Sequence, residues 1–149
     1  MMRTAGRGQD GLAKAIQTDN SGYLLTKPAT NAIEEIPIFE ALEIRDTNNY
    51  DKSINLAKYK SVTFIAYNNL DQDITVGFRN MSQFIRIWNG TEFVNLNVIL
   101  DATTRGYRVI LNTALPELNN NFYTLHFRLK CDIAPTVGQI TIIGHGELR

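Results

Sequence analysis

Apolar and polar residues alternate with a period of two along most of the chain after residue 36. The clearest case is residues 122–131, in which every second residue from Tyr123 to Cys131 is apolar and the residues between them are polar. Successive side chains of a strand point to opposite faces, so this period is typical of a strand with one buried face. The pattern predicts a fold made of strands rather than helices.

The stretch SVTFIAYNNLDQDITVGF, residues 61–78, predicts two such strands joined by a polar turn. The turn is expected at residues 68–73, because Asn and Asp bond to nearby backbone and tolerate left-handed φ/ψ. We expect the two strands to pair as a hairpin at the centre of the fold. The residues that this hairpin would bury are Val62, Phe64, Ala66, Ile74, Val76 and Phe78.

Other segments read in the same way. Residues 36–45 contain helix formers, but their alternation and the position of Pro37 favour a strand. Residues 46–52 are expected to form a polar loop, and Asn89-Gly90 predicts a two-residue type I′ hairpin turn. Further strands are predicted at residues 84–88, 93–100, 106–111 and 139–148, with a short strand or connector at residues 54–56.

About eight strands at regular spacing, without a long helix, predict an all-β fold. The expected architecture is a two-sheet antiparallel sandwich, jelly-roll-like, with an extended N-terminal arm. Residues 1–35 form the expected arm, with a short hairpin of residues 15–18 against residues 23–26 as one arrangement of it. Residues 36–149 form the expected β-sandwich domain. The arm has too few apolar residues for a core of its own, so we expect it to lie against another surface.

Charge and composition argue against several classes of function. Lys+Arg and Asp+Glu both number 15, and this balance argues against a nucleic-acid partner, since such binding depends on basic residues. No run of about 18 apolar residues occurs, so membrane insertion is not expected. The N-terminal segment lacks the apolar core of a signal peptide, so secretion by that route is not expected. With the single cysteine Cys131, no disulfide can form within the chain.

His126, His145 and Glu147 are the candidate metal ligands. If the last two strands paired, the two histidines would approach each other, and two imidazoles with a carboxylate could hold a transition metal. That site would allow a small metal-dependent enzyme. The alternative is that both histidines simply face solvent, and the sequence favours this alternative, because strand pairing and register are both assumed.

Oxygen ligands for calcium occur in two loops, residues 46–51 and Asp71-Gln72-Asp73. Ordinary turn chemistry explains the same residues. Aromatic side chains could form a surface on which a sugar stacks, and Trp88, beside a predicted hairpin tip, is the leading candidate for ligand binding. Aromatic residues in strands also serve as core or cross-strand partners. The other aromatic candidates are Tyr50, Tyr59, Tyr67 and Tyr107.

Nothing in the chain has the pattern of a catalytic nucleophile or a phosphate-binding glycine loop. Cys131 falls on the apolar face of its strand, where a thiol is unreactive. Glu34 and Glu35 are neighbours on an extended segment, so their side chains point in opposite directions. Two carboxylates arranged in this way cannot readily flank one bond as general acid and base. The sequence therefore predicts a protein without enzymatic activity and without a cofactor.

Two stretches carry a resemblance: GRGQDGLAKAIQTDNSGYLLT (residues 6–26) and TFIAYNNLDQDITVGF (residues 63–78). They resemble the N-terminal segments and sandwich hairpins of tailed-phage and prophage virion proteins, of the small β-sandwich kind found in tails, baseplates and fibres. The resemblance implies a self-associating structural subunit, with other virion proteins as partners. It implies a location in the virion, or in the host cytoplasm before assembly.

Two functions follow as hypotheses. The first is a virion structural or accessory subunit that forms homo-oligomers through its N-terminal arm, which needs a surface to lie against. The alternative is a carbohydrate- or receptor-binding β-sandwich module, with Trp88 and the loop aromatics as contacts.

Overall fold

The computed structural model describes residues 32–80, 83–120 and 122–149, all within one compact unit, Asn31–Arg149. The first strand, β1, begins at Ile33, so residues 33–35 of the expected arm already belong to a sheet. The rest of the arm, including the short hairpin expected at residues 15–18 and 23–26, lies outside the described residues.

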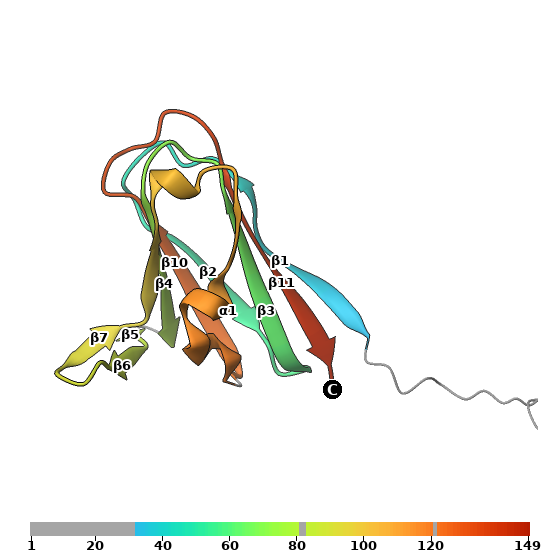
Figure 1. Cartoon of the computed structure of the whole chain (residues 1–149). Helices are drawn as coiled ribbons and strands as arrows, with labels where there is room; N and C mark the ends of the chain where they lie inside the picture. The colour runs from blue at the N-terminus through green and yellow to red at the C-terminus, as the bar shows by residue number, and fades with distance from the viewer. Residues whose placement is uncertain (1–31, 81–82, 121) are drawn as a thin grey trace, which may run out of the picture. The chain divides into compact units, whose positions relative to one another are not determined.

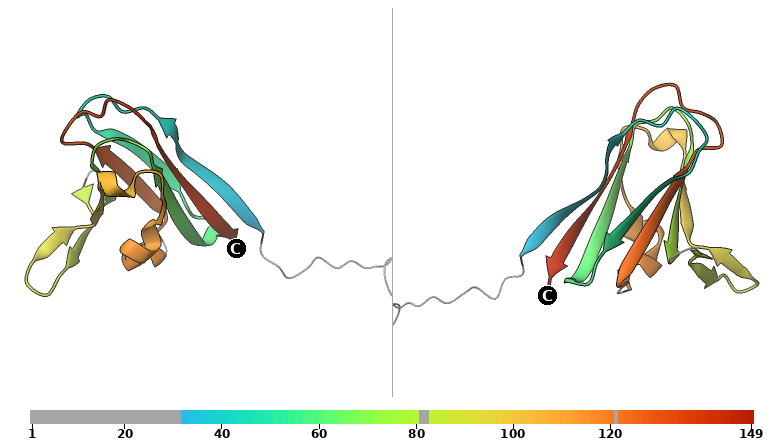
Figure 2. Two further views of the ribbon diagram at one scale, coloured as in Figure 1. Left: turned by 45° about the horizontal axis from the view of Figure 1, so that its top comes forward. Right: turned by 180° about the vertical axis from the view of Figure 1, so that it is seen from behind.

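The fold is all-β, and its strands form antiparallel sheets that lie face to face (Figures 1 and 2). One sheet, here the β11 sheet, has the strand order β1-β11-β3-β9. The other, here the β10 sheet, has the order β2-β10-β4, with β5 and β8 both paired to the far edge of β4. The strands of the β11 sheet are β1 (Ile33–Leu42), β3 (Tyr59–Asn68), β9 (Arg108–Ile110) and β11 (Ile140–Leu148). Those of the β10 sheet are β2 (Tyr50–Asn55), β4 (Ile74–Asn80), β5 (Gln83–Phe84), β8 (Asn97–Leu100) and β10 (Thr124–Lys130).

The remaining elements are short. Strands β6 (Arg86–Trp88) and β7 (Phe93–Asn95) pair only with each other and form a separate hairpin. One α-helical turn, α1 (Leu111–Ala114), and two 3-10 turns, η2 (Ala102–Thr104) and η3 (Pro116–Asn119), connect strands. None of the helices in the described part of the chain combines the length and the apolar character that crossing a lipid bilayer requires.

The expected central hairpin of residues 61–78 is wrong in its pairing. Both strands form, as β3 and β4, and their buried faces are as predicted, with Phe64, Ile74 and Phe78 in the core. However, β3 lies in the β11 sheet and β4 in the β10 sheet, so the connection crosses between sheets. The reason lies in the loop, where Leu70 is fully buried and closes one end of the core. An exposed hairpin turn would leave that leucine in water.

The last two strands also do not pair. β10 lies between β2 and β4, whereas β11 lies between β1 and β3. Alternation along a strand predicts which face is buried, but both inner faces of a two-layer fold bury apolar residues in the same way. The neighbour of each strand is therefore not determined by its own pattern.

Three other predictions change in detail. The strand expected at residues 36–45 forms, but it begins earlier and ends earlier, at Ile33 and Leu42. A register shift beside Pro37 turns both Ile38 and Phe39 into the core. β1 is an edge strand, where a residue without an N–H is tolerated. The loop expected at residues 46–52 ends earlier, because β2 begins at Tyr50. The strand expected at residues 84–88 is divided at Ile85, between β5 and β6.

Phenylalanine side chains join the two sheets. Phe127 of β10 contacts Phe78 of its own sheet and Phe64 of the opposite sheet, edge to face, with ring centroids 4.9 and 5.4 Å apart. All three rings are buried. Leu125 and Leu129 flank Phe127 on the same face of β10 and are also buried, as the alternation predicts. The centre of the core is therefore an aromatic contact between the sheets.

Replacing Phe127 by alanine should lower the free energy of unfolding by about 3–5 kcal/mol, since it removes the aromatic contact and leaves a cavity. Phe127→Leu should cost less, because it keeps most of the volume. Tyr123→Ala, at an exposed aromatic just before the same strand, is the control and should change stability by less than about 0.5 kcal/mol. Urea unfolding monitored by circular dichroism measures all three, and equal losses for Phe127→Ala and Tyr123→Ala would contradict the assignment of the core.

Candidate functional site

The β6–β7 hairpin extends from the edge of the β10 sheet (Figure 1). Three backbone hydrogen bonds attach it there. Ile85 N–H donates to the carbonyl of Phe78 (3.0 Å), Leu96 N–H donates to the carbonyl of Ile85 (2.7 Å), and Phe78 N–H donates to the carbonyl of Leu96 (3.1 Å). Leu96 is fully buried in the core. The base of the hairpin is thus held by the fold.

A four-residue loop, residues 89–92, closes the hairpin. Asn89 N–H donates to the carbonyl of Glu92 (3.1 Å), and Asn89 Oδ1 accepts from the N–H groups of Thr91 and Glu92, each at 2.9 Å. The predicted two-residue type I′ turn is wrong, since that turn requires positive φ at both central residues. Gly90 has a φ of 99°, but Asn89 does not adopt a positive φ. The Asn89 side chain orders the tip.

One face of this hairpin is aromatic and exposed. Trp88 and Phe93 are opposite each other in the register, and their ring centroids are 5.1 Å apart in an edge-to-face arrangement. Trp88 is 58% exposed and Phe93 is 64% exposed. The next pair along the hairpin, Ile87 and Val94, points to the opposite face, where Ile87 packs against the core.

Sequence reasoning found Trp88 and missed Phe93. The partner could have been inferred from the loop, because two residues that flank a hairpin loop directly face each other. Arg86 and Asn95 form the next matching pair on the same face, and they were missed for the same reason.

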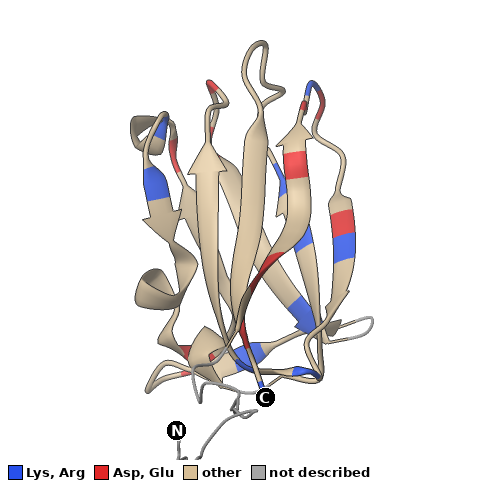
Figure 3. Cartoon of the chain, turned by 90° about the vertical axis from the view of Figure 1, so that its right-hand side faces the viewer, with Lys and Arg blue, Asp and Glu red and all other residues tan. Residues whose placement is uncertain are grey.

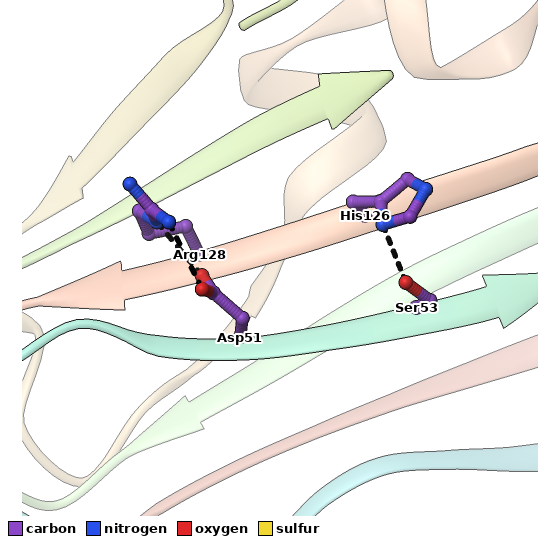
Figure 4. Close-up of polar contacts among 4 residues, drawn as sticks. All are labelled: Asp51, Ser53, His126 and Arg128. Atoms are coloured by element: carbon purple, nitrogen blue, oxygen red, sulfur yellow. Dashed lines mark hydrogen bonds and ion pairs between the residues drawn. The ribbon is translucent and has the colours of Figure 1, made fainter. Parts of the chain in front are cut away.

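The outer face of the β10 sheet carries two polar pairs between β2 and β10 (Figure 4). Arg128 donates to both carboxylate oxygens of Asp51, at 2.7 and 2.9 Å. The guanidinium holds the pKa of the Asp51 carboxyl below its ordinary value. The hydroxyl of Ser53 is hydrogen-bonded to Nδ1 of His126. These cross-strand pairs fix the side chains of this face to one another.

The candidate metal ligands are not brought together. His126 is on β10, whereas His145 and Glu147 are on β11, in the opposite sheet, and each lies on the outward-facing side of its strand. Glu147 accepts a hydrogen bond from Ser61 (3.2 Å) and lies 3.7 Å from Nζ of Lys60. The described residues contain no group of three His, Cys, Asp or Glu side chains placed to hold an ion. The expected approach of the two histidines is wrong, because it required β10 and β11 to pair.

The loop carboxylates Asp46, Asp71 and Asp73 accept hydrogen bonds from protein groups, Asp46 within its own loop and the other two from neighbouring connections. Asp46 accepts from Tyr50 Oη at 2.9 and 3.0 Å and from the N–H of Asn48 at 3.1 Å. Asp71 accepts from the N–H and hydroxyl of Thr136 at 3.0 and 2.5 Å, and these bonds lower the pKa of its carboxyl. Asp73 accepts from Ala102 N–H at 2.8 Å. The bond from Asn48 to Asp46 is ordinary turn chemistry, whereas Asp71 and Asp73 join their loop to other connections.

The candidate tyrosines have several different positions. Tyr59 is buried and donates to Glu34 (2.8 Å), and Tyr50 is partly buried beside Asp46. Tyr67 lies on the outer face of the β11 sheet under the guanidinium of Arg108, 5.5 Å from the ring centroid. Tyr107 is exposed before β9. Trp88 therefore shares its surface with Phe93 rather than with these tyrosines.

Cys131 is fully buried, as its place on the apolar face of β10 predicted. Burial raises the pKa of its thiol to about 11, so almost none of it is thiolate at neutral pH. A thiol in this state is a poor nucleophile.

The two central strands of the β11 sheet, β3 and β11, carry few charged residues, whereas its edge strands β1 and β9 carry glutamates and an arginine (Figure 3). No charged residue occurs from Ser61 to Asn68 or from Ile140 to Gly146. Ile65, Tyr67, Thr141 and Ile143, together with Gly106 and Arg108, line a shallow hollow of about 420 Å³. Ile110, opposite Ile65 in the register, is 48% exposed at the edge of this hollow. We call the outward side chains of Ile65, Tyr67, Ile110, Thr141 and Ile143 the β11 face.

No known protein family has a model that matches the chain, and no curated protein matches it. The geometry leaves two surfaces without a partner among the described residues: the β11 face and the exposed face of the β6–β7 hairpin.

Replacing Asp51 by asparagine should lower the free energy of unfolding by about 0.2–1 kcal/mol at pH 7, the usual range for an exposed ion pair. The folded-state pKa of Asp51 is depressed, so its stabilising effect is complete above the unfolded-state value, near 3.8, and is lost as pH falls through the lower folded-state value. The difference between the variants should therefore shrink only below about pH 4.

Asp132→Asn is the matched control, since its carboxylate is 92% exposed and 3.8 Å from Lys130. Urea unfolding between pH 2 and pH 7 measures both variants. A gap between wild type and Asp51→Asn that stayed constant to pH 2 would contradict the role of the Asp51–Arg128 pair.

Proposed function

We propose that this chain is a non-enzymatic structural or accessory subunit of a tailed-phage or prophage virion, which forms homo-oligomers with the help of its N-terminal arm. Other virion proteins are its further partners, and it resides in the virion or, before assembly, in the host cytoplasm. The observation that carries the proposal is the β11 face, a surface of mostly apolar side chains around a hollow with Arg108 at its side.

A jelly-roll fold is part of the proposal. Strands β1 to β4 alternate between the sheets, as do β8 to β11, and the orders β1-β11-β3-β9 and β2-β10-β4-β8 support two interwound Greek keys. This is the arrangement expected of a jelly roll, an architecture that occurs in viral capsid proteins and in lectins. The fold supports a virion or binding role without deciding between them.

The position of the arm supports self-association. Residues 1–31 lead into β1, which is an edge strand of the same sheet that carries the β11 face. Across that sheet, Pro37 of β1 is the neighbour of Ile143. An arm that leads into this edge strand can contribute to covering the β11 face in a neighbouring copy, and edge strands gain the pairing partners they lack.

Light scattering on the full chain and on a version without residues 1–31 tests the proposal. The full chain should be an oligomer, and the shortened version should dissociate or associate more weakly. Ile143→Glu should also weaken association, because it places a charge in the apolar contact. Thr124→Glu, on the outer side of β10, is the control and should not. If the full chain is a monomer, the proposal of self-assembly fails.

A second candidate function is a carbohydrate- or receptor-binding module. The exposure of Trp88 favours it, since an indole without a packing partner on one side offers a flat apolar surface to a sugar ring. In this role the hairpin would contact a glycan on a cell surface.

A glycan array with the wild type and Trp88→Ala tests this candidate. Wild type should bind at least one glycan class, and Trp88→Ala should lose most of that signal. Tyr107→Ala, which removes a more exposed aromatic side chain elsewhere, should keep it. Absence of any wild-type signal, or full binding by Trp88→Ala, would count against carbohydrate binding through the hairpin.

A further inference from the structure

The exposed side of the β6–β7 hairpin carries four side chains. Cross-strand neighbours point to the same side, so Arg86 and Asn95 lie beside Trp88 and Phe93. The two rings occupy the end near the loop, and the guanidinium and the amide occupy the end near the sheet. We call these four residues the hairpin face.

Arg86 differs from the other described arginines. Arg45, Arg105 and Arg149 donate to backbone carbonyl oxygens, and Arg128 pairs with Asp51. Arg79 and Arg108 lie over the rings of Phe84 and Tyr67. Among the described arginines, Arg86 alone has a side chain that makes no hydrogen bond, ion pair or ring contact with a described residue. Its five N–H donors are free to bind an acceptor from outside.

This combination selects a chemical class of ligand. Aromatic rings pack against the apolar C–H faces of sugar rings, and an amide can donate to and accept from hydroxyl groups. A guanidinium matches the two oxygens of a carboxylate with two parallel hydrogen bonds. A neutral sugar would use the rings and the amide and leave the arginine without an anion. A carboxylated sugar would use all four side chains.

Size favours a saccharide over a protein. A stable protein interface buries about 800 Å² on each partner and uses about 20–30 residues a side. The hairpin has two strands of three residues each and offers four side chains on this face. A few sugar units can cover such a surface.

We propose that the hairpin face binds an oligosaccharide that carries a carboxylate, with the sugar rings against Trp88 and Phe93 and the carboxylate on Arg86. Asn95 hydrogen-bonds a neighbouring hydroxyl. The inference rests on the second candidate function above and adds the class of ligand to it. A single shallow site of this kind binds weakly, and several copies in a homo-oligomer would raise the avidity.

An array that carries uronic-acid oligomers, sialylated oligosaccharides and the neutral counterpart of each tests the inference. Wild type should bind carboxylated members in preference to their neutral counterparts. Arg86→Gln should bind the carboxylated members about tenfold more weakly, as loss of a charged hydrogen-bonding partner predicts. It should change binding to the neutral members by less than about twofold. Phe93→Ala should weaken both groups, because both contact the rings.

Arg149→Gln, at another exposed arginine, is the charge-matched control and should bind as wild type does. Preference for neutral glycans, or unchanged binding by Arg86→Gln, would overturn the carboxylate while leaving carbohydrate binding intact. No wild-type signal on any glycan would overturn the second candidate function and this inference together. Binding to vesicles of anionic lipid that depended on Trp88, with no glycan signal, would assign the hairpin face to a membrane surface instead.

Discussion

The contact of Phe127 with Phe64 and Phe78 is the interaction on which the rest of the structure depends. Neither sheet can exist alone in water, because each has one apolar face that must be covered. Phe127 links the two faces at their centre, and an edge-to-face ring pair contributes about 0.5–1.5 kcal/mol beyond the area it buries. Because these rings lock the sheets together, the outer faces are held in fixed positions and can carry function.

The outer faces differ in how their side chains are used. On the β10 sheet, Asp51 pairs with Arg128 and Ser53 pairs with His126, so its polar groups are largely satisfied by one another. The β11 face has few groups to satisfy and stays apolar and open. The polar side chains of the β10 sheet are thus paired across its strands, while the β11 face is mostly apolar.

The sequence predicted local structure better than it predicted neighbours. The period of two identified nearly every strand and most of the core, including Phe64, Phe127 and Cys131, because burial on one face is a property of each strand alone. Which strands pair depends on where loops cross, and the relevant signal was a single apolar residue, Leu70, within a polar turn. The two histidines were expected to meet only because β10 and β11 were assumed to pair, and these strands lie in different sheets. Trp88 was identified from its residue type, but its neighbours on the hairpin could be identified only from the pairing register of β6 and β7.

The two unpartnered surfaces can operate at the same time. The β11 face lies on the outside of one sheet. The β6–β7 hairpin is attached to the edge of the other sheet, beside β4. The proposed association through the β11 face would therefore use a different surface from the one that carries Trp88 and Phe93. The attachment at Ile85 and Leu96 fixes each hairpin relative to its sheet, so an oligomer would hold several hairpin faces at set spacings. The proposed weak site for a carboxylated sugar would become effective under that condition, since a repeated glycan can occupy several copies at once.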